Sequence, residues 1–381
     1  MSVRRAAALG AAVAAALALT AGRAAAQWTA GTGPDYLRFD FDEGLDARSA
    51  ELLTIPVAVR IPATDALTFD VSSAWARGRV ETGAGVMELS GPVDTGVRAA
   101  WQIRPWILVT LGANLPTGNS SHDAEEAIAA AVLSTDLLGF RETTFGHGSA
   151  LTSSVALART AGGFGLGLAA AYSVRGSFEP SAEQADLEYR PGSEARVRVG
   201  VDRNFGNSTL TLGASFISYT HDRAAERNLF KAGNRFRFDA TYAFRMGAGV
   251  WTLYAADLVR QRGDLSLEVL DPQGVAQGTT EVETPAQNLL VAGVTGAVGL
   301  GGGFVFRPNV DFRLQRREDA SGSTAGSGWI LALGGDVPIR IFGRYDWFPA
   351  AGVLLGSIED AAGADIGVFG LELRGTVRTS F

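Results

Sequence analysis

Cysteine is absent from the sequence, which has only three histidines and one lysine, Lys231, among its 381 residues. Without cysteine the chain can form neither disulfides nor thiolate metal sites, and it has no cysteine nucleophile and no lipidated N-terminal cysteine. The basic residues are almost all arginine, the net charge is −7, and no basic block stands out. Nucleic acid is therefore not an expected partner.

Long hydrophobic runs are absent after residue 27, so helices cannot carry the mature chain across a membrane. At the N-terminus, Arg4 and Arg5 precede the small apolar segment 6–19, and three alanines at 24–26 fit an A-x-A cleavage site. This pattern predicts a cleaved secretory signal peptide over residues 1–26. A single membrane anchor is the alternative, which the short, alanine-rich run disfavours.

Apolar and polar residues alternate along most of the chain from about residue 50. In segment 234–246, Phe, Ala and Tyr fill most even positions, whereas Arg, Asp and Thr fill most odd ones. Segments 163–175, 192–204 and 302–317 repeat the pattern. A period of two indicates β-strands with one apolar and one polar face.

Two architectures produce such strands: a soluble β-sandwich, and a membrane barrel whose apolar face meets lipid and whose polar face lines a wet lumen. The alternating segments run 10–15 residues, which exceeds the roughly 5–6 of globular sheets and suits a tilted membrane crossing. Arginine recurs on the polar face, and a signal peptide precedes the strands. We therefore predict an all-β fold, a transmembrane antiparallel up-and-down β-barrel of the bacterial outer membrane with about 14–16 strands.

Turn signals separate sixteen candidate strands, and short links alternate with long ones. Membrane barrels place tight turns in the periplasm and longer loops outside, so this asymmetry sets the orientation. The expected long links are 80–92, 116–148, 176–191, 221–233, 263–286 and 318–325. The expected strands are 36–43, 51–61, 66–79, 93–103, 105–115, 149–160, 163–175, 192–204, 207–220, 234–246, 249–262, 287–299, 302–317, 326–336, 338–357 and 365–381.

The N-terminal segment 27–50 has two interpretations, and the barrel domain is expected over 51–381. The segment either supplies the first strand or enters the lumen as a plug, which would leave a wall of fourteen strands. Its plug candidates are Tyr36, Phe39 and Phe41.

One part of the longest link departs from the β pattern. Residues 123–133 read D-A-E-E-A-I-A-A-A-V-L, a helix-forming run with acidic residues in its first turn. Ser120 or Ser121 is the expected N-cap. The helix either orders the loop or forms a lid or constriction over the barrel mouth.

The C-terminal segment ends in an aromatic residue, Phe381, with apolar residues at alternate positions before it. This pattern resembles the signal by which outer-membrane barrels are recognised for insertion. The segment would be a last strand with a lipid-facing side and an edge available for closure. The barrel-insertion machinery is thus an expected partner, besides outer-membrane lipid.

The alternation also predicts which side chains line the lumen. There they either set the selectivity for ions and solutes or pair with one another and fill the interior. The candidates are Arg196, Arg198, Arg235, Arg237, Asp239, Arg245, Arg307, Asp311, Arg313, Glu372 and Arg374.

Catalytic signals are weak. His122, His147 and His221 all fall in or beside expected outer loops, and His221 precedes Asp222, a possible orienting carboxylate. No G-x-S-x-G, H-E-x-x-H or phosphate-binding loop occurs. We expect no enzyme, no cofactor and no metal site.

A short motif carries a family resemblance. Residues 108–118 read L-V-T-L-G-A-N-L-P-T-G, and the strand-then-LPTG pattern resembles the outer-membrane family named for the meta-pathway of phenol degradation. That family is related to barrels of the long-chain fatty-acid transporter type. Segments 53–60 and 67–71 are similar to its opening hairpin. The resemblance implies uptake of hydrophobic or aromatic compounds, and an N-terminal plug.

These observations favour a passive channel or transporter of the cell outer membrane, for small and hydrophobic or aromatic solutes. A barrel of eight to ten strands would be filled, whereas fourteen to sixteen strands leave room for solute. One alternative is a structural or surface-binding barrel without transport. The other is an outer-membrane hydrolase.

Overall fold

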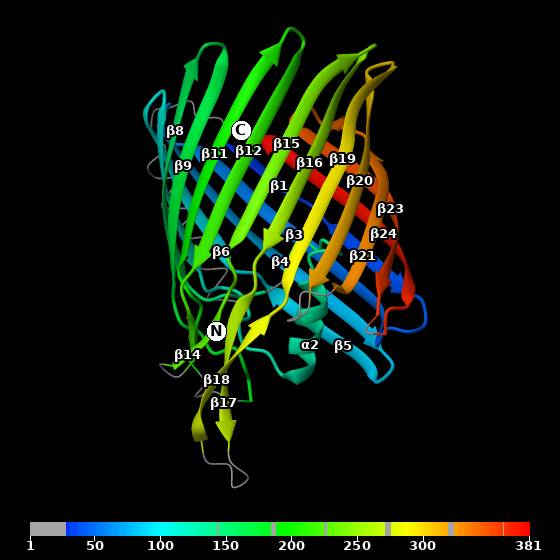
Figure 1. The fold of residues 1–381 in the computed structure, drawn as a ribbon. Helices are drawn as coiled ribbons and strands as arrows, with labels where there is room; N and C mark the ends of the chain where they lie inside the picture. Colours follow the sequence, from blue (N-terminus) through cyan, green and yellow to red (C-terminus); the bar gives the residue numbers. More distant parts are fainter. Residues whose placement is uncertain are drawn as a thin grey trace.

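The computed structural model describes residues 28–142, 145–183, 188–224, 227–270, 276–318, 324–360 and 362–381. The predicted signal peptide, 1–26, lies outside the described residues. Strands dominate this part of the chain and form a closed antiparallel barrel of sixteen strands (Figure 1). Within the same ranges, no helix is both long and apolar enough to cross a membrane.

The wall follows the order of the sequence, because each strand pairs with the one before and the one after it. Its continuous strands are β3 (Ala47–Pro62), β4 (Leu67–Thr82), β7 (Ile107–Leu115), β8 (Ala150–Ala161), β9 (Phe164–Arg175), β11 (Glu194–Phe205), β12 (Ser208–Tyr219), β15 (Arg235–Met246), β16 (Gly249–Arg260), β19 (Ala286–Gly301), β20 (Phe304–Glu318), β23 (Tyr345–Glu359) and β24 (Asp365–Ser380). Three more are interrupted: β1 (Thr29–Thr32) with β2 (Asp35–Phe41), β5 (Gly85–Pro92) with β6 (Thr95–Arg104), and β21 (Thr324–Asp336) with β22 (Ile339–Ile341).

The first strand closes the wall, so the plug interpretation of the N-terminal segment is wrong. β1 and β2 pair with β3 on one side and with β24 on the other. Tyr36, Phe39 and Phe41 therefore lie in a wall strand, where Tyr36 is opposite Leu53 and Leu373. Backbone pairing to two neighbours satisfies N–H and C=O groups that a lumen plug would have to satisfy by other means.

Two other boundaries differ from the sequence expectation. The expected loop 80–92 is a β-hairpin, since β4 continues to Thr82 and β5 begins at Gly85. The expected strand 338–357 is divided by a tight turn at 342–344 between β22 and β23. In the second case the apolar residues on both sides of the turn obscure the break.

The two ends of the barrel differ as the link lengths predict. The tight turns between β8 and β9, β11 and β12, β15 and β16, and β19 and β20 share one end, the upper one in Figure 1. Gly162 and Gly163 in the first of these turns have φ values of 59° and 81°, which favour glycine. At the other end β10 (Tyr189–Arg190), β13 (Asp222–Ala224), β14 (Arg227–Lys231), β17 (Gly263–Leu270) and β18 (Ala276–Thr284) form a separate five-stranded sheet.

The strand register divides side chains between two faces. Val199 pairs with Leu168 and Ala214, so the three share one face. Large apolar residues on this face are exposed to the surroundings, as in Phe238, 53% exposed, and Val199, 51% exposed. An apolar band of this kind around a closed barrel is the surface that lipid covers. Asp257 is an exception on this face, and its carboxylate accepts a hydrogen bond of 2.7 Å from Asn288.

We predict that a charge on the outward face destabilises the barrel. Val199→Arg should lower the free energy of unfolding in lipid vesicles by about 2–4 kcal/mol, because the guanidinium would lie in the hydrocarbon region. Thr211→Arg is the control, since Thr211 faces the other way, opposite Asp202 and Thr241. Urea unfolding measures both, and equal losses for the two variants would contradict the assignment of faces.

Candidate functional site

The long link between β7 and β8 folds into the lumen; we call its described residues, 116–142 and 145–148, the lumen loop. Its helix, α2 (Ala124–Leu133), begins at Asp123, whose carboxylate accepts from the backbone N–H of Glu126. Glu126 in turn accepts from the N–H of Asp123, which completes a capping box. The expected N-cap at Ser120 or Ser121 was therefore wrong by two or three residues.

Apolar side chains of the lumen loop pack against the inner wall. The Phe140 ring meets the Phe39 ring edge-on, with centroids 5.5 Å apart. Leu133 and Leu137 are fully buried. The cluster also includes Ala50, Leu52, Ala76, Val80 and Leu89 from β3–β5, and Leu289, Ile330, Leu354 and Val368 from β19–β24. Ile330 and Ala332 of this cluster lie opposite Arg313 and Asp311, on the polar face of the strands, so the loop packs on the inside of the barrel.

Asp94, at the break between β5 and β6, anchors both ends of the lumen loop. Its buried carboxylate accepts from the backbone N–H of Gly118 at 2.9 Å and of His147 at 2.7 Å, and from Asn114 Nδ2 at 2.9 Å. Gly118 ends the LPTG motif, and a Cβ there would lie 2.8 Å from the Asp94 nitrogen and closer still to the Phe145 carbonyl. This position of the motif thus requires glycine for the close approach of three backbone segments.

On the far side of the barrel, wall residues bind the loop backbone. Arg313 on β20 donates to the Leu138 carbonyl at 3.0 Å, and Gln287 on β19 donates to Asp136 at 2.9 Å. A third contact is the ion pair of Arg141 with Asp35 on β2, at 3.0 Å. The loop therefore crosses the lumen from β7 and β8 to the opposite wall.

The register places every predicted lumen residue on the inward face. These residues are Arg196, Arg198, Arg235, Arg237, Asp239, Arg245, Arg307, Asp311, Arg313, Glu372 and Arg374. Many of them form ion pairs with inward neighbours. These ion pairs are Arg198 and Arg237 with Asp239, Arg307 with Asp336, Arg313 with Asp311, Arg374 with Glu372, and Arg196 with Glu194. Among the described residues, Arg235 and Arg245 have no ion pair.

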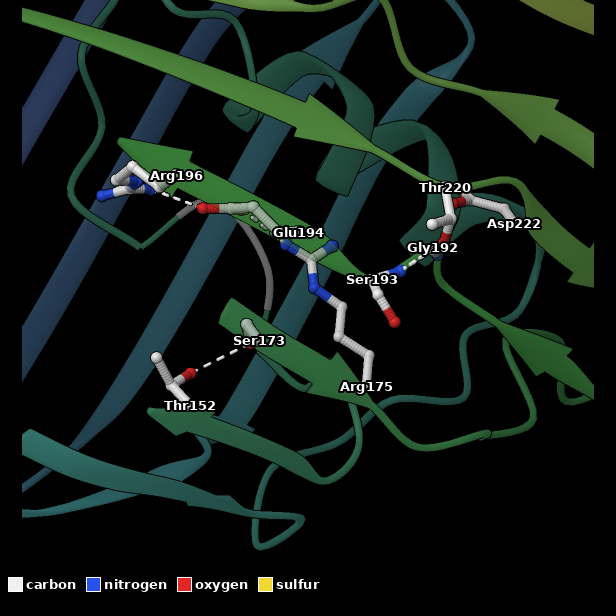
Figure 2. A network of polar contacts seen from close by, with 9 residues as sticks. All are labelled: Thr152, Ser173, Arg175, Gly192, Ser193, Glu194, Arg196, Thr220 and Asp222. Carbon is white, nitrogen blue, oxygen red and sulfur yellow. Dashed lines mark hydrogen bonds and ion pairs between the residues drawn. The ribbon is translucent and has the colours of Figure 1, made fainter. Parts of the chain in front are cut away.

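The wall between β8 and β11 carries a polar network (Figure 2). Glu194 accepts from Arg196 at 2.7 Å and from Arg175 at 3.2 Å. Beside it, Thr152 donates to Ser173 at 2.9 Å. In Figure 2 the two arginines approach Glu194 from opposite sides, and their charges compensate that of its carboxylate. The Arg196 side chain is 51% exposed and the Arg175 side chain 35%.

The remaining lumen contains a cavity of about 840 Å³ on the side of the tight turns. Asp70 lies in it between Arg60, at 2.7 Å, and Arg98, at 2.6 Å. This triad is not among the lumen residues predicted from the sequence, although the alternation of the three strands concerned places all three residues on the polar face. A smaller cavity of about 360 Å³ next to it reaches Arg141 and Glu142 of the lumen loop.

The acidic groups beside two of the histidines have other hydrogen-bond partners or lie beyond hydrogen-bond distance. The carboxylate of Asp222, beside His221, already accepts from the backbone N–H of Gly192 at 2.6 Å and from the Tyr189 hydroxyl. His122 lies 3.6 Å from Glu126 at the start of α2. In the described ranges, no group of three or more His, Asp or Glu residues could hold a metal ion.

No family model matches this chain, and no curated protein matches it. Solved structures of outer-membrane proteins are similar over nearly the whole length. A Pseudomonas aeruginosa protein, OccK1 (OpdK), is 8% identical with a TM-score of 0.48, over 94% of this chain and 99% of that one. A loop-deletion mutant of OmpT, an outer membrane protein of Vibrio cholerae, is 11% identical with a TM-score of 0.42, over 94% and 100%.

A third similar structure, a bacterial polysaccharide outer membrane secretin, is 10% identical with a TM-score of 0.44, over 92% of this chain and 98% of that one. The family that the LPTG motif suggested therefore gains no support from these comparisons. At such identities function must be argued from the chain's own residues.

We predict that Arg313→Leu loosens the lumen loop, because the variant loses the donor to the Leu138 carbonyl. The loop should become sensitive to protease at Arg141, and any ionic conductance through the barrel should rise. Arg307→Leu is the matched control, since Arg307 lies on the same strand and pairs with Asp336 at 2.6 Å. Equal protease sensitivity in both variants would contradict an anchoring role for Arg313.

The Glu142 carboxyl makes the lumen charge sensitive to pH. Burial raises its pKa, and nearby Arg141 only partly offsets this effect. As pH falls from 7.5 to 5, Glu142 should gain its proton earlier than an ordinary glutamate, so the preference for anions should increase. Reversal potentials in a KCl gradient measure this preference. Glu142→Gln should remove that step, and an unchanged pH profile in this variant would refute the prediction.

Proposed function

We propose that the chain is an outer-membrane channel for passive diffusion of small solutes, with the lumen loop as its constriction. The observation that carries the proposal is the uneven cover of the inner wall. Where the loop packs, the Arg313 side chain is 23% exposed, whereas Arg196 and Arg237 on the uncovered side are 51% and 50% exposed. The route for solute therefore follows β9 to β15.

Barrel width supports the same proposal. Sixteen strands enclose more space than inward side chains alone can fill. Inward residues along the uncovered wall are also small, among them Gly167, Ala169, Ala171, Gly200 and Gly213. Small side chains beside exposed arginines favour a water-filled route rather than a packed interior.

The chemistry of the lining favours polar solutes. Strand aromatics such as Phe236 and Phe238 share the outward face, and the inner apolar cluster around Phe39 is already occupied by the lumen loop. The exposed inner wall instead presents guanidinium groups. Uptake of hydrophobic or aromatic compounds, which the family resemblance implies, remains a prediction with less support than a polar solute.

Location in the outer membrane follows from the outward apolar band and the signal peptide predicted over residues 1–26. We propose that the barrel-insertion machinery recognises β24 and Phe381. In the folded barrel, the Phe381 N–H donates to the Trp28 carbonyl at 2.9 Å, so this end of the strand is available only before closure.

A second candidate function, surface binding without transport, is favoured by the sheet of β10, β13, β14, β17 and β18. This sheet lies outside the wall pairing, at the end opposite the tight turns, and β17 and β18 extend away from the barrel (Figure 1). It would present a surface to a partner outside the cell. If the barrel binds such a partner but does not conduct ions, surface binding would be favoured over the channel function.

We predict that the purified, detergent-folded protein forms steady single-channel steps in planar bilayers. Deletion of residues 124–140 should increase the step size, because the constriction is removed. Heat-modifiable mobility in gels verifies that the shortened chain still folds. A folded protein that gives no steps, with or without the loop, would overturn the channel proposal.

A further inference from the structure

Three arginines and one glutamine form a row across the inner wall at the outer mouth. Arg235 on β15 is directly opposite Arg260 on β16, Arg260 is opposite Gln287 on β19, and Gln287 is opposite Arg317 on β20. Like charges directly opposite each other on neighbouring strands are destabilising. The facing pair of Arg235 and Arg260 should therefore lower the stability of the barrel, and the fold alone does not explain why it is present.

The row differs from the other inward arginines in its partners. Arg198 has a bidentate partner in Asp239, at 2.8 and 2.7 Å. By contrast, Arg260 donates to the Gln287 amide oxygen at 2.7 Å, and Arg235 lies over the Tyr219 ring at 5.6 Å. In the part of the chain that the structure describes, neither of them nor Arg317 has an ion pair with a carboxylate.

These arginines surround a cavity of about 380 Å³ between the wall and the lumen loop. Ser134 and Thr135, just after α2, contribute hydroxyl groups to its lining. The one carboxylate in the lining is Asp136, which accepts from Gln287 Nε2 at 2.9 Å. Three guanidinium groups against one carboxylate leave a positive charge excess inside the cavity.

We propose that this cavity is an oxyanion-binding site, which takes the carboxylate or phosphate group of a solute as it enters the barrel. The inference rests on the proposed channel function and names the solute class. Guanidinium groups are suitable for binding an oxyanion because their paired N–H donors match the oxygens of carboxylate and phosphate. Arg260 is half-buried at the centre of the row, while Arg235 and Arg317 are exposed on either side of it.

Asp136 should allow a bound anion to dissociate from the site again. Its negative charge opposes a bound anion, while its hydrogen bond holds the Gln287 amide toward Arg260. Conduction requires sites that bind strongly enough to attract a solute and weakly enough to let it leave. The site is thus expected to hold anions at millimolar rather than micromolar concentration.

The test measures block of the chloride current by inorganic phosphate and, separately, by benzoate, in planar bilayers. Arg260→Gln should raise the half-blocking concentration at least tenfold. Arg245→Gln is the matched control, because Arg245 is an inward arginine of β15 that lies outside this cavity. Its half-blocking concentration should change less than twofold. Block by only one of the two anions would show which oxyanion the site selects.

Binding measured without transport separates this inference from the channel proposal. Titration calorimetry of the detergent-folded full chain with phosphate should give binding that Arg260→Gln weakens at least tenfold and Arg260→Lys weakens less. Phosphate binding by a protein that does not conduct would contradict the proposed channel function but support the proposed oxyanion-binding site. The oxyanion-binding site would be contradicted, and the channel function supported, by either of two results. In the first, phosphate and benzoate leave the conductance unchanged; in the second, they block Arg260→Gln as strongly as the unsubstituted protein.

Discussion

Closure of the wall between β24 and the first strand is the constraint on which the rest of the structure depends. A membrane offers no water to unpaired backbone groups, so a strand edge in lipid would cost several kcal/mol for each group. Here Thr29 pairs with Ser380, and Asp35 pairs with Arg374. Because the wall has no free edge, alternate side chains along each wall strand face lipid and the lumen. Phe238, for example, faces lipid, whereas Asp239 faces the lumen.

The lumen loop and the wall are complementary in composition, and this complementarity supports the route for solute that we propose. The wall is apolar where the loop packs, at Leu52, Ile330 and Leu354, and it is charged and exposed on the opposite side. Asp94 holds the base of the loop and Arg313 its far end. The loop, anchored at both ends, lies between the arginine row of β15–β20 and the cavity around Asp70.

The sequence predicted the strands and their faces because both depend on local alternation, and so all eleven lumen candidates face inward. It could not decide whether residues 36–43 form wall or plug, because that choice depends on pairing with β24, more than 300 residues away. The path of the lumen loop could not be predicted from the sequence either. Leu137 and Phe140 follow no period, and the contact between Arg313 and Leu138 joins residues 175 positions apart. The N-cap was missed because Asp123, Ser120 and Ser121 are all suitable cap residues.

The most direct test of the central claim asks whether the lumen loop lies against the far wall. Because the chain has no cysteine, Leu137→Cys with Gly328→Cys introduces the only two thiols, at positions where a Gly328 Cβ would lie 2.6 Å from Leu137 Cδ2. A short thiol crosslinker should join them within one folded chain, and it should not join Leu137→Cys to Ala169→Cys on the uncovered wall. Absence of the first crosslink in a folded barrel, or equal yields for both pairs, would contradict a loop that crosses the lumen.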